Sequence, residues 1–211
     1  MSQNMFWTTT ARRAQRLPVA CLVVCLGLPA MAAILDLDEY LQRANASKRR
    51  GDWQSAASQY AQAVNHPDLP KVGAERSQVY LEYGRAVGAL CQFAEAEKYL
   101  LLAKDAADKA GSPSFHPLYE LGGVSVAQRK FADAVRYFAQ IVPAPPGPSV
   151  GPASPLQFAD VYEKFALALD ATGKADEAQQ HRQAALALRN ANPKPAVAGS
   201  TIDYAARCPR S

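Results

Sequence analysis

The sequence predicts an all-α fold built of about four successive helix pairs, and three observations lead to this prediction. Alanine dominates the apolar residues, and alanine favours helix because it loses no side-chain entropy when a helix forms. Two small residues recur along the chain at a constant separation of twelve positions. Glycine and proline stand between the segments that carry these small residues, where helices are expected to end. With 211 residues, the chain is long enough for one domain with a sizeable core.

The repeat consists of two columns of small residues. Its four copies are Ala44 and Ala56, Gly84 and Ala96, Gly122 and Ala134, and Ala166 and Ala178. A large apolar residue lies four positions before the first column in every copy, and an aromatic residue lies three positions before the second column in the first three copies. Small residues let the backbones of two helices approach closely, and large neighbours fill the space on either side.

This pattern resembles the tetratricopeptide repeat family, in which two antiparallel helices pack around small residues. The resemblance covers roughly residues 36–190 and implies a right-handed helix-turn-helix solenoid of about four pairs. The period departs from the family standard of about 34 residues, because the first small column advances by 40, 38 and then 44 positions. In the fourth copy Ala175 and Arg182 replace large residues, which predicts a terminal repeat with a polar outer face.

Residues 1–32 are predicted to be a secretory signal peptide. Three arginines precede an uncharged run over residues 17–35, and Ala30-Met31-Ala32 supplies a small-x-small cleavage pattern. Cleavage near Ala32 would leave a periplasmic or secreted protein that is not inserted in the membrane. The alternative is an uncleaved membrane anchor, because the run is long enough to span a bilayer.

The rest of the chain is predicted to consist of a repeat domain and a tail. The repeat domain spans residues 33–190, and it is interrupted by residues 143–155, where six prolines favour an extended loop over helix. Residues 191–211 form the predicted tail, in which residues 201–207 are a candidate for a short capping helix.

The charge balance disfavours nucleic-acid binding. The chain has 23 basic and 19 acidic residues, but removal of the three leader arginines leaves 20 basic residues against 19 acidic ones. So small an excess offers little to neutralise phosphates.

Cys91 and Cys208 are the two cysteines outside the predicted leader. An even number of cysteines in an oxidising compartment permits a disulfide between them. Two unpaired thiols are the alternative, and the sequence leaves both open.

No catalytic, cofactor or metal site is predicted. None of the three histidines lies at metal-ligand spacing from another histidine or a cysteine, and no glycine-rich phosphate loop is present. His66 and His116 stand beside prolines and are expected to be exposed in loops. Glu82, Glu120 and Glu163 are expected to belong to a solvated helix face.

In tetratricopeptide arrays the first helix of each pair lines a concave groove that holds a segment of a partner. By helical spacing, the resemblance implies that six residues face this groove: Leu41, Asn45, Leu81, Arg85, Tyr119 and Val126. Gly123 is expected to leave a gap that admits a partner. The fourth pair adds mostly acidic residues, which would orient the partner: Asp160, Glu163 and Asp170.

The expected function is therefore that of a non-catalytic protein–protein interaction scaffold in the bacterial cell envelope, with another envelope protein as its partner. One alternative is an enzyme, or an enzyme subunit, that acts on envelope polymers through carboxylates in the groove. A second is a membrane-anchored assembly factor, if the leader is not cleaved. The sequence does not indicate an oligomeric state.

Overall fold

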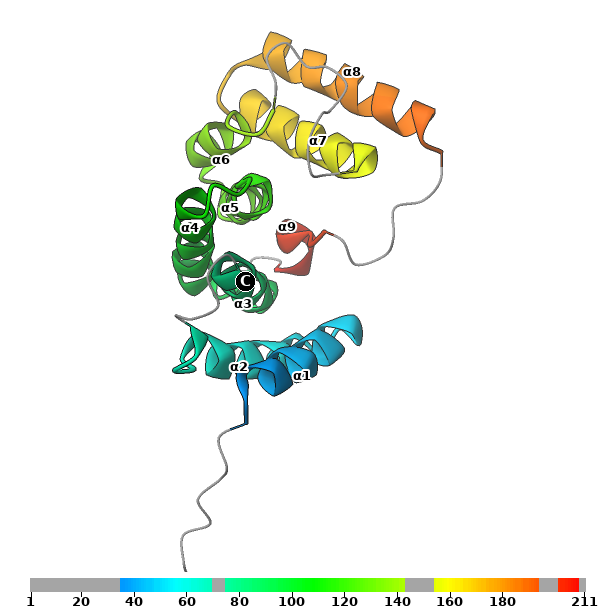
Figure 1. The fold of residues 1–211 in the computed structure, drawn as a ribbon. Helices are drawn as coiled ribbons and strands as arrows, with labels where there is room; N and C mark the ends of the chain where they lie inside the picture. The colour runs from blue at the N-terminus through cyan, green and yellow to red at the C-terminus, as the bar shows by residue number, and fades with distance from the viewer. Residues whose placement is uncertain (1–34, 70–74, 143–153, 194–200, 209–211) are drawn as a thin grey trace, which may run out of the picture. The chain divides into compact units, whose positions relative to one another are not determined.

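The computed structural model describes residues 35–69, 75–142, 154–193 and 201–208 (Figure 1). The helices of this part are α1 (Leu37–Arg49), α2 (Trp53–Val64), α3 (Glu75–Ala89), α4 (Phe93–Lys109), α5 (Phe115–Ala127), α6 (Phe131–Phe138), α7 (Pro155–Ala171), α8 (Ala175–Ala191) and α9 (Tyr204–Arg207). Within the described ranges no residue lies in a strand, so the predicted all-α class is confirmed. The predicted leader and nearly all of the proline-rich loop lie outside them.

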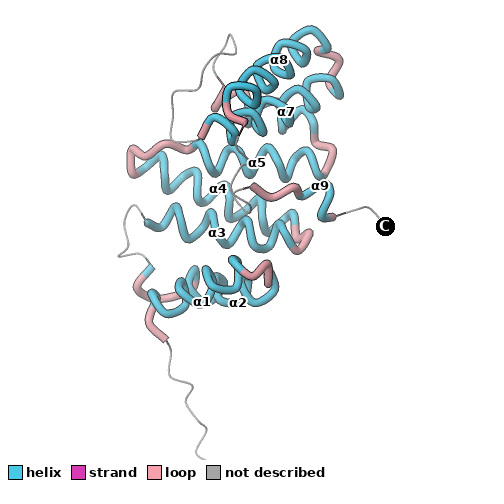
Figure 2. Tube along the Cα trace, turned by 90° about the vertical axis from the view of Figure 1, so that its right-hand side faces the viewer, coloured by secondary structure: helices cyan, strands magenta, loops and turns pink. Residues whose placement is uncertain are grey.

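Consecutive helices pack in pairs, α1 with α2, α3 with α4, α5 with α6 and α7 with α8. The second helix of each pair also packs against the first helix of the next, and α5 contacts both α3 and α7 (Figures 1 and 2). The first helices of the last three pairs therefore lie side by side. Among the described helices, none has both the length and the apolar character needed to cross a bilayer.

The four pairs turn in the same way. Two positions before the second helix, the backbone is left-handed, with φ of 75° at Gly51, 64° at Cys91, 59° at Arg129 and 81° at Gly173. In each turn the next residue donates its N–H to a carbonyl five positions earlier, at 2.9 to 3.0 Å. This is the Schellman closure of a helix C-terminus. The four turns therefore share one backbone conformation, although the left-handed position is glycine in two of them and Cys91 or Arg129 in the others.

Polar side chains fix where several helices begin. The Asp36 carboxylate accepts from the Glu39 N–H at 2.7 Å and starts α1. Ser154 and Gln157 form a capping box at the start of α7, and Pro155 occupies its first turn. Pro is tolerated there because the first N–H groups of a helix have no partner within it.

The predicted small columns lie at the closest helix contacts. The alanines in these columns are at most 1% exposed: Ala44, Ala56, Ala96, Ala134, Ala166 and Ala178. A Cβ on Gly84 would lie 2.9 Å from Leu100 Cγ, and one on Gly122 would lie 2.4 Å from Phe138 Cε1. At such distances the facing side chain would have to shift, so glycine allows the α3–α4 and α5–α6 pairs to close at this separation.

The outer face of the fourth pair is polar only in part. Arg182 is exposed and forms an ion pair with Asp170. Leu186, one turn from Arg182 on α8, is also exposed, at 60%, and Leu167 on α7 is exposed at 51%. The predicted polar replacement is present, but apolar residues remain on this last pair.

Two histidines do not lie in exposed loops as the sequence suggested. His66 is buried, with Nε2 3.1 Å from the Leu35 carbonyl oxygen, while its Nδ1 accepts from the Asp68 N–H at 3.2 Å. His116 is half-buried in the first turn of α5. The neighbouring proline correctly marked a loop at His66 but not the packing that buries it, and at His116 the proline lies within the first turn of a helix.

Candidate binding groove

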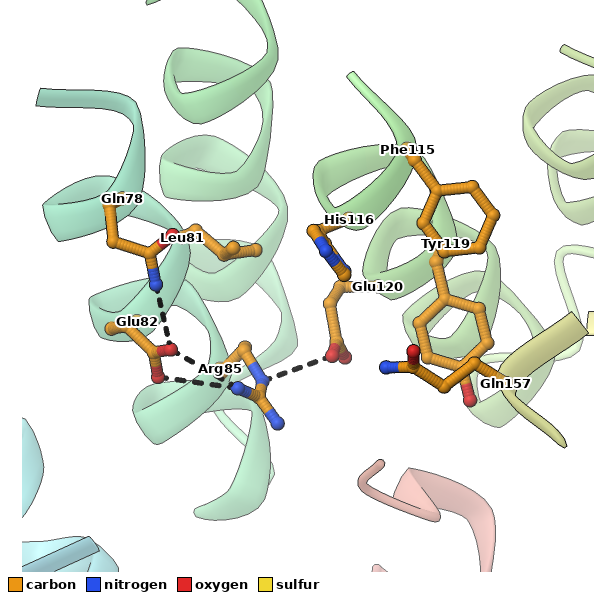
Figure 3. A pocket seen from close by; sticks show the side chains of 9 residues that line it. All are labelled: Gln78, Leu81, Glu82, Arg85, Phe115, His116, Tyr119, Glu120 and Gln157. Atoms are coloured by element: carbon orange, nitrogen blue, oxygen red, sulfur yellow. Dashed lines mark hydrogen bonds and ion pairs between the residues drawn. The ribbon is translucent and has the colours of Figure 1, made fainter. Parts of the chain in front are cut away.

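Two adjoining pockets lie along the first helices of successive pairs. The first has a volume of about 160 Å³ and is lined from α3, α5 and α7 (Figure 3). The second has a volume of about 360 Å³ and is lined from α1 and α3, with Tyr60 from α2. Gln78 and Glu82 line both, so the pockets meet on α3. We call the two pockets together the groove.

Five of the six predicted groove residues line it. Leu41 and Asn45 line the second pocket, and the first is lined by Leu81, Arg85 and Tyr119.

Val126 lies elsewhere, contrary to the helical-spacing prediction. It is 9% exposed and belongs to an apolar cluster with Phe138 and Phe165. The end of α5 that carries Val126 packs among α6 and α7, so this position contributes to the core.

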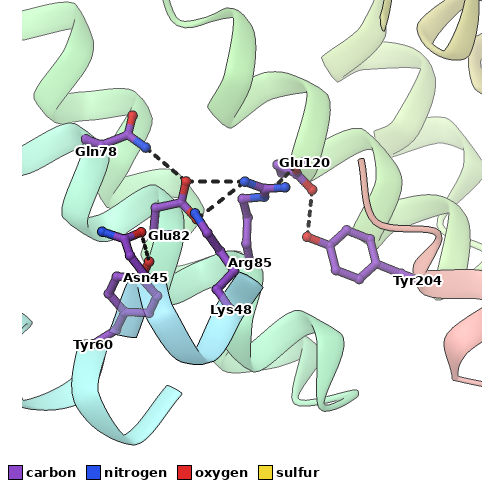
Figure 4. A network of polar contacts seen from close by, with 8 residues as sticks. All are labelled: Asn45, Lys48, Tyr60, Gln78, Glu82, Arg85, Glu120 and Tyr204. Atoms are coloured by element: carbon purple, nitrogen blue, oxygen red, sulfur yellow. Dashed lines mark hydrogen bonds and ion pairs between the residues drawn. The ribbon is translucent and has the colours of Figure 1, made fainter. Parts of the chain in front are cut away.

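Glu82 is the centre of a polar cluster in the groove (Figure 4). Lys48 Nζ from α1 lies 2.8 Å from its carboxylate, and Arg85 Nη1 lies 3.2 Å from it. The Gln78 amide donates to the same carboxylate at 3.0 Å. These contacts link α1 to α3 through charge.

Glu120 continues this cluster onto α5. Arg85 Nε lies 3.0 Å from its carboxylate, and Tyr204 Oη donates to it at 2.6 Å. Arg85 therefore bridges Glu82 and Glu120. Burial opposes the charged form of Arg85, but the neighbouring Glu120 and Glu82 outweigh it and raise its pKa.

The two groove carboxylates are not part of a solvated face, which corrects the sequence-based expectation. Glu82 and Glu120 are 7% and 4% exposed. Burial of a carboxylate costs several kcal/mol unless a cation and hydrogen bonds compensate it. Lys48 and Arg85 supply two positive charges for the two negative ones, so the cluster is internally neutral.

The acidic residues of the fourth pair are also compensated. Arg189 lies 2.7 Å from both the Asp160 and the Glu163 carboxylates. Asp170 is paired with Arg182 on α8. Arg182 and Arg189 of α8 therefore largely neutralise the acidic residues expected at this end of the array. Helical spacing along α7 alone did not predict these ion pairs.

An aromatic surface forms one side of the first pocket. The rings of Phe115 and Tyr119 are parallel within 1°, with centroids 6.4 Å apart. Lys164 Nζ donates to Tyr119 Oη at 2.9 Å and lies 4.8 Å from the ring centroid. Next to them, burial lowers the pKa of His116, so its imidazole is neutral at neutral pH. A neutral ring nitrogen can accept a hydrogen bond from a ligand.

The C-terminal segment Thr201–Cys208 docks on α3 and α5. Tyr204 is 1% exposed, and its ring lies against two glycines. A Cβ on Gly88 would be 2.8 Å from Tyr204 Cε1, and one on Gly123 would be 3.4 Å from Cδ2. The gap expected at Gly123 therefore exists, but the chain's own tail fills it. Burial, followed by the nearby Glu120, raises the pKa of Tyr204, so its phenol remains a donor.

A disulfide holds this segment in place. Cys208 is joined to Cys91 in the α3–α4 turn, across 117 positions of sequence. Arg207 Nε donates to the Ala89 carbonyl at 2.7 Å, and its guanidinium lies 5.6 Å from the Trp53 ring. The predicted short helix forms as α9, but it packs on α3 and α5 and does not cap the last pair.

The docking of the tail was not predicted, although the sequence carries a signal for it. Gly88 and Gly123 stand inside helices, outside the small columns. Glycine at such positions costs about 1 kcal/mol relative to alanine, so it indicates a close approach. The structure shows such an approach at Gly88, whereas a Cβ at Gly123 would meet Tyr204 at an ordinary contact distance. The signal does not say which segment approaches.

Within the described residues no group of three or more histidine, cysteine or acidic side chains could hold a metal ion. No model of a known protein family matches the sequence, and no curated protein matches it either.

Proposed function

We propose that this chain is a non-catalytic binding protein of the bacterial cell envelope that holds a segment of another protein along the groove. The observation that carries the proposal is the continuous row of two pockets over the first helices of successive pairs. Such a row suits an extended or helical segment, because its side chains can enter successive pockets.

The repeat architecture supports the proposed assignment to the tetratricopeptide type, for which right-handed stacking is expected. The buried small columns recur in every pair, and so does the Schellman turn. Repeat arrays present extended surfaces for recognition. The spacing of 38 to 44 residues is longer than the family standard. Long helices such as the 17-residue α4 add residues to some repeats, and the connection from Phe138 to Pro155 adds them to the repeat with the longest spacing.

The groove offers mixed chemistry to a partner. Leu41 is half-buried and supplies apolar contact, and Arg85 is of a residue type that often dominates binding energy. Leu81 and Tyr119 also line the groove, but each is only 5% exposed and offers little accessible surface. Gln78 is exposed where the two pockets meet, and although one N–H of its amide donates to Glu82, its amide oxygen and second N–H can pair with a partner backbone.

An envelope-polymer hydrolase would need carboxylates for catalysis, and the ion pairs in which these carboxylates are engaged support the non-catalytic proposal. Glu82 and Glu120 are ion-paired with Arg85, and Glu163 is ion-paired with Arg189. Each of these carboxylates is therefore already engaged by a cation of the same chain. No feature of the groove favours the enzyme alternative.

The leader pattern of residues 1–32 supports the proposed export. N-terminal sequencing of the protein from the envelope fraction is expected to begin at Ala33. A chain that begins at Met1 in that fraction would favour the anchored alternative.

In-cell photo-cross-linking tests the binding proposal directly. We expect a benzophenone amino acid at Gln78 to capture a defined envelope protein. The matched control is the same amino acid at Gln62, which is exposed on α2 and lines neither pocket. Identical adducts from both positions, or none from Gln78, would contradict a partner in the groove.

A further inference from the structure

Part of the proposed binding surface is already occupied by the protein itself. Glu120 lines the first pocket and also accepts the hydrogen bond from Tyr204. The segment Thr201–Cys208 therefore extends the groove cluster at its α5 side (Figure 4). This segment of the chain thus fills part of the groove in the way that a bound peptide would.

The seat of Tyr204 has the features of a selective site. We define the tyrosine seat as Gly88, Gly123 and Glu120. The ring packs on both glycines, of which only Gly88 leaves no room for a Cβ, and the Glu120 carboxylate accepts the phenol hydrogen. Phenylalanine would fill the ring position but would leave this buried carboxylate oxygen without its donor. A larger ring has no room beside Gly88, since even a methyl group there would lie 2.8 Å from the tyrosine.

The segment Thr201–Cys208 buries too few side chains to stay docked without the Cys91–Cys208 disulfide. Only Ile202 and Tyr204 are buried, whereas Asp203, Ala205 and Ala206 are exposed. Eight residues must lose backbone freedom to adopt this one conformation, and two buried side chains offset only part of that cost. The disulfide keeps the segment at high effective concentration next to its seat.

The disulfide is placed where a reductant can reach it. Cys91 is exposed in the α3–α4 turn, and Cys208 is half-buried. Thiol–disulfide exchange requires access to one sulfur along the S–S axis, and rates depend on such access.

We propose that Thr201–Cys208 is a built-in ligand of the groove, and that reduction of the Cys91–Cys208 disulfide opens the tyrosine seat to a tyrosine-bearing segment of a partner protein. This inference rests on the proposed binding function and adds the chemistry of the partner and the regulation of the site.

A dithiol reductant carries out the step. Its first thiolate attacks the Cys91 sulfur, the S–S bond breaks, and Cys208 leaves as a thiolate that takes up a proton. The second thiol of the reductant attacks the mixed disulfide and releases Cys91, which also takes up a proton. Two electrons and two protons pass to the protein, and the reductant becomes a disulfide.

The test uses the full chain, oxidised and after treatment with dithiothreitol. The probe is a fluorescent peptide with the sequence of residues 201–208 that carries Cys208→Ser. We expect its affinity, measured by anisotropy, to rise at least tenfold on reduction. The same peptide with Tyr204→Ala is expected to show no such rise. Full-length Cys91→Ser/Cys208→Ser protein is expected to bind the probe equally with and without dithiothreitol.

Tryptic cleavage after Arg207 reports on the tail independently. We expect slow cleavage in the oxidised chain and at least tenfold faster cleavage after reduction, with helicity unchanged by circular dichroism. Unchanged cleavage would overturn release of the tail. Faster cleavage without tyrosine-dependent peptide binding would overturn the seat as a partner site.

Failure of the proposed binding function would give a different result from failure of this redox inference. In that case the probe would still bind in a redox-dependent way, while Gln78 would capture no envelope protein in either redox state.

Discussion

Tyr204 and Glu120 form a 2.6 Å hydrogen bond between side chains that are 1% and 4% exposed and 84 positions apart in sequence. This bond connects the C-terminal segment to the ion pairs of the groove. It therefore couples the stability of the fold to the occupancy of the proposed binding surface.

Tyr204→Phe is expected to lower the free energy of unfolding by about 1.5–3 kcal/mol, because a hydrogen bond to a charged group is lost while the ring remains. Tyr60→Phe is the matched control. It removes a 2.9 Å hydrogen bond to the neutral Asn45 amide and should cost about 0.5–1.5 kcal/mol. Urea unfolding of both variants measures the difference, and equal losses would contradict a special role for Glu120.

Gly122→Ala is expected to destabilise the protein by about 1–3 kcal/mol, because the new methyl group would collide with the Phe138 ring. Phe138→Leu in the same chain should recover part of that loss. The neighbouring Gly123→Ala places its methyl group at an ordinary contact distance from Tyr204, and alanine favours helix by about 1 kcal/mol. Thermal unfolding should therefore show a loss of stability for Gly122→Ala but not for Gly123→Ala. Similar losses in both variants would show that contact with Phe138 is not the cause.

The free energy of unfolding is expected to fall as the pH decreases from about 7 toward 5. Burial lowers the pKa of His116 and of His181 from the ordinary value of 6.5. The unfolded chain therefore binds protons at a higher pH than the folded chain, so the stabilising contribution is present above pH 6.5 and is lost below it. His181→Phe, between the Tyr162 and Phe165 rings, should weaken this dependence in urea unfolding at several pH values. An unchanged dependence of the unfolding free energy on pH in this variant would show that His181 does not contribute to it.

Arg129→Gly is expected to stabilise the protein by about 0.5–1 kcal/mol. Its backbone is left-handed at φ 59°, which costs a residue other than glycine about 1–2 kcal/mol, and the extra freedom of glycine in the unfolded chain returns part of that gain. The equivalent position of the fourth pair already holds Gly173, and Gly173→Ala should destabilise by about 1 kcal/mol. A gain from Gly173→Ala, or a loss from Arg129→Gly, would show that the two turns are not equivalent.

The sequence by itself determined the features that are local or periodic. Helix-favouring composition, small columns twelve positions apart and turn residues set the helix pairs, because their causes act between residues on the same or the adjacent helix. Gly84 and Gly122 were identified for this reason, and so were five of the residues that line the groove.

Only the tertiary structure decided what lies in the groove. Glu82 and Glu120 have the sequence appearance of solvated helix carboxylates, and Tyr204 lies in a tail without periodicity. Their burial follows from contacts made across tens of residues, including the link from Cys208 to Cys91. Helical spacing predicts which residues share a face, whereas long-range packing decides whether water, an arginine or the chain's own tyrosine covers that face.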